Sequence, residues 1–260
     1  MDESTGVNHE DPDMVLFGGS PTTIRLVVGI VLAAVFAVLA LLPMSGFIAA
    51  GGVATLMSFA VCMTPLFGVI LGPARGFVMG LIAGVLGTLV SIPIGGGVFL
   101  LVPTTILGPA LAGLFVGLSL KPLHEWKSVK IPGPILTAAF FLVIIVLYEI
   151  PYYSAWWFMT PYMLTLGVAI ILQGMRIEYS PDREDWRKYA QLVPFTLIGT
   201  MADHSMMAMG SVYLLGLEPV LLGYGIFPVM LLERIFVIAV STVLLSIILN
   251  VFHKEHWMQV

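Results

Sequence analysis

Long apolar segments separated by short polar stretches run through almost the whole chain. A helix that spans a membrane needs about 20 mainly apolar residues, and about eight segments meet or approach that length. The pattern predicts an all-α fold, a polytopic transmembrane helix bundle of about eight spans. Pro228 is expected to separate a short outer piece from the last span, because proline kinks a helix. The predicted spans are 24–42, 48–71, 76–93, 98–120, 133–150, 160–176, 190–216 and 220–251.

The composition agrees with a membrane location. Hydrophobic residues make up 59% of the chain and charged residues only 10%, whereas a soluble domain carries about 25% charged residues. We expect a single transmembrane domain at 24–251, between a short acidic cytoplasmic tail at 1–23 and a second cytoplasmic tail at 252–260. This plan leaves no room for a soluble catalytic domain. Cys62 is the only cysteine, which excludes an intrachain disulfide and a cysteine-rich metal site.

The basic residues predict the orientation. Cytoplasmic loops of membrane proteins are enriched in Lys and Arg. With eight spans and the N-terminus inside, ten of the eleven Lys and Arg residues lie on the cytoplasmic side, and Arg234 lies within the last span. We therefore expect a multi-pass protein of a prokaryotic plasma membrane with both termini cytoplasmic. The ten cytoplasmic residues are Arg25, Arg75, Lys121, Lys127, Lys130, Arg176, Arg183, Arg187, Lys188 and Lys254.

Four ionisable residues fall inside the last two predicted spans: Asp203 and His204 in one, Glu233 and Arg234 in the other. Ionisable groups at membrane depth are costly and mark functional or pairing sites. Neighbouring helical positions point about 100° apart, so one member of the Asp203–His204 pair is expected to face a cavity and the other a neighbouring helix. Two interpretations remain open: Asp203 pairs with Arg234 and locks the two helices together, or these residues bind a substrate.

Small residues recur at a spacing of four. Such faces let helix backbones approach closely in lipid. We interpret the glycine rows as internal packing, whereas the alanine pair of the first span could instead dock a second membrane subunit. The glycine rows are Gly76, Gly80 and Gly84, followed by Gly113 and Gly117, and the alanine pair is Ala33 and Ala37.

Several of these motifs together resemble the substrate-binding S components of energy-coupling factor (ECF) vitamin transporters, in particular atypical, archaeal-like members. The resemblance covers about residues 24–120 and 190–251. It rests on the alanine pair, the motif Leu71–Gly76 followed by Gly80 and Gly84, the motif Gly199–His204, and Phe227–Pro228 with Glu233 and Arg234. S components have six helices, so the resemblance implies a six-helix core in which residues 132–176 form an additional helical hairpin.

The resemblance implies a membrane-embedded substrate-binding subunit of an ATP-driven importer for a small vitamin-like or polar metabolite. Asp203, His204, Glu233 and Arg234 would bind the substrate, and the segment Ser91–Val98 would form a lid or, alternatively, a plain turn. Ala33 and Ala37 would face a transmembrane coupling subunit, which works with two cytoplasmic ATPases. The chain itself lacks a GxxxxGK[ST] phosphate loop.

No catalytic residue is expected, because Asp203 and His204 alone are too little for catalysis. We also expect no metal site, no cofactor and no nucleic-acid partner. The methionines after His204 are interpreted as flexible packing residues. The alternative functions are a self-sufficient ion-coupled secondary transporter and a structural membrane protein without a transport role.

Overall fold

The computed structural model describes residues 22–45, 57–94, 101–126, 129–175 and 186–254. Within these ranges the fold is all-α, as predicted, and it contains eight α-helices. Most of them lie within a predicted apolar segment or differ from it by a few residues, but α2 covers only the last eight residues of the predicted span 48–71, where a strand and a 3-10 turn precede it. They are α1 Thr22–Leu39, α2 Thr64–Leu71, α3 Pro73–Ser91, α4 Val102–Ser119, α5 Gly133–Tyr152, α6 Thr160–Gly174, α7 Arg187–Tyr213 and α8 Phe227–Lys254.

Short elements join these helices. The 3-10 turns are η2 Phe59–Met63, η3 Ile92–Ile94 and η5 Tyr153–Met159, and a π-helical turn, η6 Leu221–Ile226, leads into α8. Pro228 is therefore the second residue of α8, close to the predicted division of the last segment. Two small antiparallel ladders pair β1 Pro43–Ser45 with β2 Met57–Ser58, and β3 His124–Trp126 with β4 Val129–Ile131.

Four helical segments of the described residues are long and apolar enough to cross a membrane: Pro73–Ser91, Val102–Ser119, Gly133–Gly174 and Leu221–Lys254. They fit a multi-pass membrane protein, but the predicted number of about eight spans is not confirmed. The segment Gly133–Gly174 counts once although it contains both α5 and α6. The apolar parts of α1 and α2 are shorter, and α7 carries polar residues along its length.

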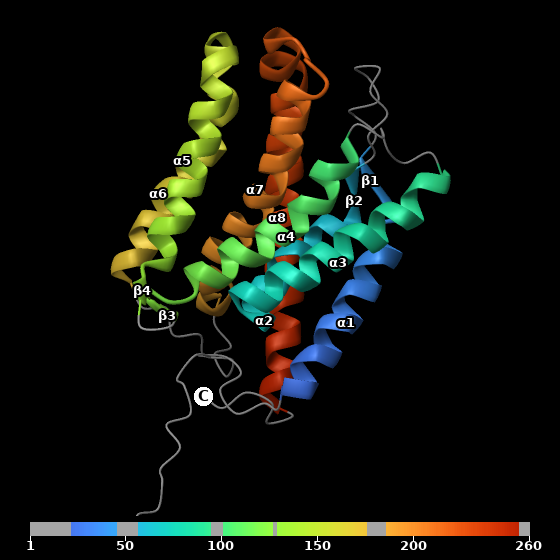
Figure 1. The fold of residues 1–260 in the computed structure, drawn as a ribbon, viewed down its shortest axis with the longest axis vertical. Coiled ribbons are helices and arrows are strands. Elements are labelled where there is room, and N and C mark those ends of the chain that lie inside the picture. Colours follow the sequence, from blue (N-terminus) through green and yellow to red (C-terminus); the bar gives the residue numbers. More distant parts are fainter. Residues whose placement is uncertain (1–21, 46–56, 95–100, 127–128, 176–185, 255–260) are drawn as a thin grey trace, which may run out of the picture.

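The helices form neighbouring groups (Figure 1). Helices α5 and α6 pack as a hairpin on one side of the molecule, and α1 packs against α3 on the other. Between them, α7 packs against α8, while α3 and α4 cross the molecule obliquely. Helix α4 contacts α2, α3, α5 and α7, and it therefore joins the first half of the chain to the second.

Glycines allow α2, α3 and α4 to touch through their backbones. A Cβ atom on Gly84 would lie 2.5 Å from the carbonyl oxygen of Ile106, and one on Gly80 would overlap the carbonyl of Pro109. A Cβ on Gly68 of α2 would lie 2.6 Å from the carbonyl oxygen of Gly113. Real Cβ atoms do not approach this closely, so these positions exclude any side chain. The interpretation of the glycine rows as internal packing is confirmed.

Gly72 joins α2 to α3 through a turn that needs glycine for a different reason. Its φ is +78°, a region that residues with a Cβ rarely adopt. Pro73 then begins α3, where its missing N–H is no loss because the first turn of a helix leaves such groups unpaired. The sequence Gly72–Pro73 thus ends one helix and starts the next without an intervening loop.

We expect Gly80→Ala to destabilise the bundle by about 1–3 kcal/mol, the usual range for overpacking, because the added methyl group overlaps the α4 backbone. Gly167→Ala in α6 is the matched control, since a Cβ there meets nothing within 4 Å. Thermal unfolding of the two purified variants in detergent measures the difference. Equal midpoints for both variants would show that the glycine contacts do not hold α3 against α4.

Candidate functional site

His204 lies in the middle of α7 and is held from outside that helix. Only 6% of the residue is exposed, and its ring atom Nδ1 is hydrogen-bonded to the hydroxyl of Tyr162, at 2.5 Å. Tyr162 lies in the first turn of α6 and is fully buried. This hydrogen bond connects the α5–α6 hairpin to the ionisable pair that the sequence singled out.

Asp203 faces a different neighbour. Its side chain is partly buried, and its Oδ1 atom lies where a Cβ on Gly108 of α4 would have to be. Glycine at position 108 therefore provides the space that the carboxyl group occupies. The two neighbours thus point to different places: Asp203 faces α4, whereas His204 contacts α6 and also lines the narrow pocket described below.

Arg234 reaches α7 from α8. It is 3% exposed, and its Nη1 atom donates a hydrogen bond to the carbonyl oxygen of Thr200 at 3.4 Å, one helical turn before His204. The charges of Arg234 and Asp203 act on each other electrostatically. Arg234 thus connects α8 to α7 through a backbone carbonyl. Glu233, its neighbour, is half-buried.

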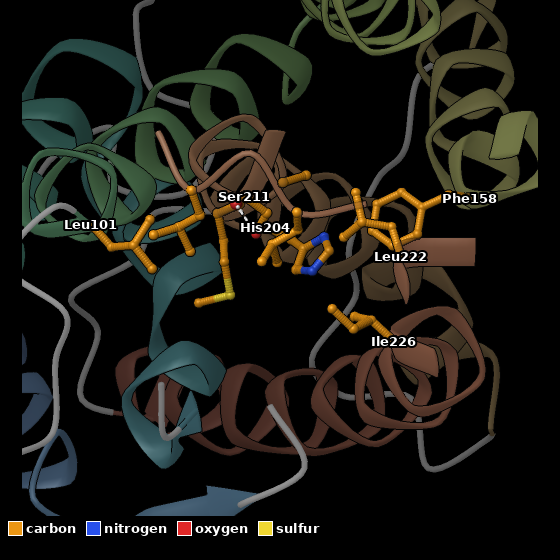
Figure 2. Close-up of a pocket in the computed structure, with 10 residues that line it drawn as sticks. Leu101, Phe158, His204, Ser211, Leu222 and Ile226 are labelled. Atoms are coloured by element: carbon orange, nitrogen blue, oxygen red, sulfur yellow. Dashed lines mark hydrogen bonds between the residues drawn. The ribbon is translucent and has the colours of Figure 1, made fainter. Parts of the chain in front are cut away.

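A narrow pocket lies beside His204, at the C-terminal end of α7 (Figure 2). In this conformation it has space for about one water molecule. Its polar lining consists of His204 and Ser211, and its other lining residues are apolar. The apolar residues are Leu101 of the segment before α4, Phe158 of η5, Met207 and Ala208 of α7, Leu215 and Leu217 after α7, and Leu222 and Ile226 of η6.

The two turns beside the pocket are fastened to each other. The indole Nε1 of Trp157 in η5 donates a hydrogen bond to the carbonyl oxygen of Gly223 in η6 at 2.9 Å. The indole also packs on Gly223, where a Cβ would lie 2.8 Å from the ring, and its centroid is 5.0 Å from that of Tyr224. Nearby, the hydroxyl of Tyr213 at the end of α7 donates to the carbonyl of Leu147 in α5. We call the Trp157–Gly223 contact the latch.

The pocket includes only one of the predicted substrate-binding residues. Of the four predicted substrate-binding residues, His204 lines the pocket, while Asp203, Glu233 and Arg234 do not. Ala33 is buried within the core and Ala37 is half-buried, so their docking role stays a prediction. In the predicted lid, Ser91 and Ile92–Ile94 are described, and Gly95–Val98 lie outside the described residues.

Sequence reasoning missed the contribution of the α5–α6 hairpin. The sequence motifs included neither Trp157, whose N–H bonds to another turn, nor Tyr162, whose hydroxyl is hydrogen-bonded to His204. The dense aromatic run Tyr152–Phe158 and the Gly-Tyr-Gly sequence at 223–225 are the signals that could have suggested a contact. In the described part of the chain, no group of three or more His, Cys, Asp or Glu side chains could hold a metal ion.

We expect Tyr162→Phe to lower the free energy of unfolding by about 1–3 kcal/mol, because it leaves the buried Nδ1 atom of His204 without its partner. Tyr224→Phe is the control, since Tyr224 is 69% exposed and its recorded contact is a ring contact with Trp157. Chemical or thermal unfolding of both variants in the same detergent makes the comparison. A similar loss in both would mean that the Tyr162 hydroxyl adds no more stability than an exposed tyrosine hydroxyl.

We expect Trp157→Phe to loosen η6, because phenylalanine keeps an aromatic ring but cannot donate to the carbonyl of Gly223. Backbone amides of Leu221–Ile226 should then exchange with deuterium faster, as measured by mass spectrometry. Trp156→Phe provides the matched control, since Trp156 is 49% exposed and packs edge-on against Trp157. Unchanged exchange in Trp157→Phe would contradict the assignment of the latch.

The whole chain was also compared with known proteins. No family model matches the chain, and no curated protein or solved structure matches it. The resemblance to S components therefore rests on the residue motifs alone.

Proposed function

We propose that this chain is the membrane-embedded substrate-binding subunit of an ECF-type, ATP-driven importer for a small vitamin-like metabolite. The observation that carries the proposal is a pocket inside the helix bundle where a buried histidine, held by Tyr162, lies among apolar side chains. Ligand sites commonly have this character, with few placed polar groups in an apolar cavity.

The place of the pocket fits uptake. In the proposed orientation, with both termini cytoplasmic and eight spans in the plasma membrane, α7 runs outward and its C-terminal end lies near the outer face. The pocket is at that end of α7. A solute arriving from outside would therefore meet it first.

The latch supplies a reason for the small size of the pocket. Phe158 belongs to η5, and Leu222 and Ile226 belong to η6, so separation of these two turns would widen the space between them. The Trp157–Gly223 hydrogen bond fastens them in the closed arrangement. Solute binding would proceed through opening of the latch, a change confined to two short turns.

The proposal also assigns partners. Since the sequence lacks a phosphate loop for ATP, energy would come from two cytoplasmic ATPases through a transmembrane coupling subunit. Helix α1, which carries Ala33 and Ala37, packs against α3 and presents an apolar face outward through Leu26, Val27, Ile30, Val31 and Val38. This helix would meet the coupling subunit, with the alanine pair at or beside the contact.

Native mass spectrometry of the protein, purified gently from its membrane, tests the proposal. We expect a complex with a coupling subunit and two ATPases, and a small molecule that stays bound to the wild-type chain. His204→Phe should lose that molecule while keeping its partners, because the substitution changes the pocket and leaves α1 intact. A chain that purifies without partners and without a bound solute would contradict the proposal.

Two further substitutions test the remaining predicted binding residues. If Asp203 and Arg234 also contact the solute, Asp203→Asn and Arg234→Gln will each lose the retained molecule while the protein stays folded. Retention in both variants would restrict the site to the pocket beside His204. Transport by the purified chain alone in vesicles, driven by a proton or sodium gradient, would instead favour a self-sufficient carrier.

A further inference from the structure

We infer that the pocket takes an uncharged, mainly apolar molecule that accepts a hydrogen bond from the Nε2–H group of His204. This inference rests on the proposed binding role of the pocket and narrows the chemical class of the solute. It follows from the hydrogen bond between Tyr162 and His204, which fixes which nitrogen of the imidazole carries the proton, and from the side chains around that ring.

The hydroxyl of Tyr162 determines the direction of the hydrogen bond. Tyr162 is fully buried, and among the described residues its hydroxyl has one hydrogen-bond partner, Nδ1 of His204. If Nδ1 carried the proton, the O–H of Tyr162 would have no acceptor, and a buried unpaired donor costs about 1–3 kcal/mol. Tyr162 therefore donates, and Nδ1 accepts.

The other ring nitrogen must then be the donor. A neutral imidazole carries one N–H and one acceptor nitrogen, so acceptance at Nδ1 places the proton on Nε2. His204 is a lining residue of the pocket, and in Figure 2 its ring points toward Leu222 and Ile226. The ring thus offers an N–H donor to a molecule between α7 and η6.

The rest of the lining excludes a charged solute. Ser211 donates its hydroxyl proton to the carbonyl oxygen of Met207 at 2.9 Å, so it offers only a neutral acceptor, and the other eight lining residues are apolar. No lining residue carries a formal charge that could pair with an ionised ligand. Removing a charge from water without such a partner is strongly unfavourable.

These features select a carbonyl, ether or similar acceptor on an apolar body. The acceptor group would meet Nε2–H of His204, and the body would contact Phe158, Leu222 and Ile226. A weak donor on the same molecule could reach the oxygen of Ser211. Asp203 and Arg234 lie outside the lining and would not pair with a charge on such a solute.

Three probes of equal ring size test this selection: cyclohexanone, cyclohexanecarboxylate and cyclohexylammonium. Saturation-transfer NMR is recorded with the full chain in lipid nanodiscs, and the signal from empty nanodiscs is subtracted. We expect binding of cyclohexanone and none of the two charged probes. His204→Phe should weaken cyclohexanone binding about three- to tenfold through loss of one hydrogen bond, while the surface variant Tyr224→Phe should not.

The tautomer is checked independently by ¹⁵N NMR of the imidazole, with His204 assigned from the His204→Phe variant. We expect the proton on Nε2 in the wild type and a loss of that preference in Tyr162→Phe. A proton on Nδ1, a charged probe that binds as well as cyclohexanone, or the absence of His204-dependent binding of cyclohexanone would each overturn the inference.

The two proposals fail in different ways. If cyclohexanone binds through His204 but the native chain has no coupling subunit or ATPases, the pocket chemistry stands and the importer role falls. If those partners copurify but a charged probe binds equally well, the importer role stands and the neutral-solute inference falls.

Discussion

Direct backbone contact between α2, α3 and α4 is the constraint on which the remaining structure depends. In lipid, apolar side chains gain little by leaving their surroundings for one another, so close packing supplies much of the attraction between helices. Glycines at 68, 80, 84 and 113 lie where a Cβ atom would overlap the backbone of a neighbouring helix. Helix α4 is thereby held against the first half of the chain, and it also packs against α7.

The position of α4 in turn shapes the site. Gly108 accommodates the carboxyl group of Asp203, and Leu101, just before α4, forms one side of the pocket. The opposite side comes from the α5–α6 hairpin and η6, which are joined through Trp157 and Gly223. One side of the pocket therefore adjoins the start of α4, and the other consists of short turns joined by a hydrogen bond. We expect opening on the side of the turns.

Much of the fold could be predicted from the sequence, because the apolar segments and the glycine spacing are local signals. The sequence also identified Asp203 and His204 and placed them on different sides of α7, since helical geometry alone decides that. The residues that contact this pair could not be predicted from the sequence. Tyr162 is 42 positions from His204, and Arg234 contacts a backbone carbonyl, which leaves no mark in the sequence. Whether the hairpin is an insertion in a six-helix core stays a prediction, yet it supplies Phe158 and Tyr162.

The polar residues of α7 also explain why this helix is less apolar than α3 and α4. Thr200 and Ser205 donate their hydroxyl protons to carbonyls of their own helix, at 2.9 and 2.6 Å, and Thr196 bonds to Thr242 of α8 at 2.9 Å. Such pairing reduces the cost of placing a hydroxyl in an apolar environment. Residue hydropathy counts these groups as if they were unpaired. The polarity of α7 is therefore compatible with a position inside the bundle, and among its residues that line the pocket His204 is the one that offers a hydrogen-bond donor.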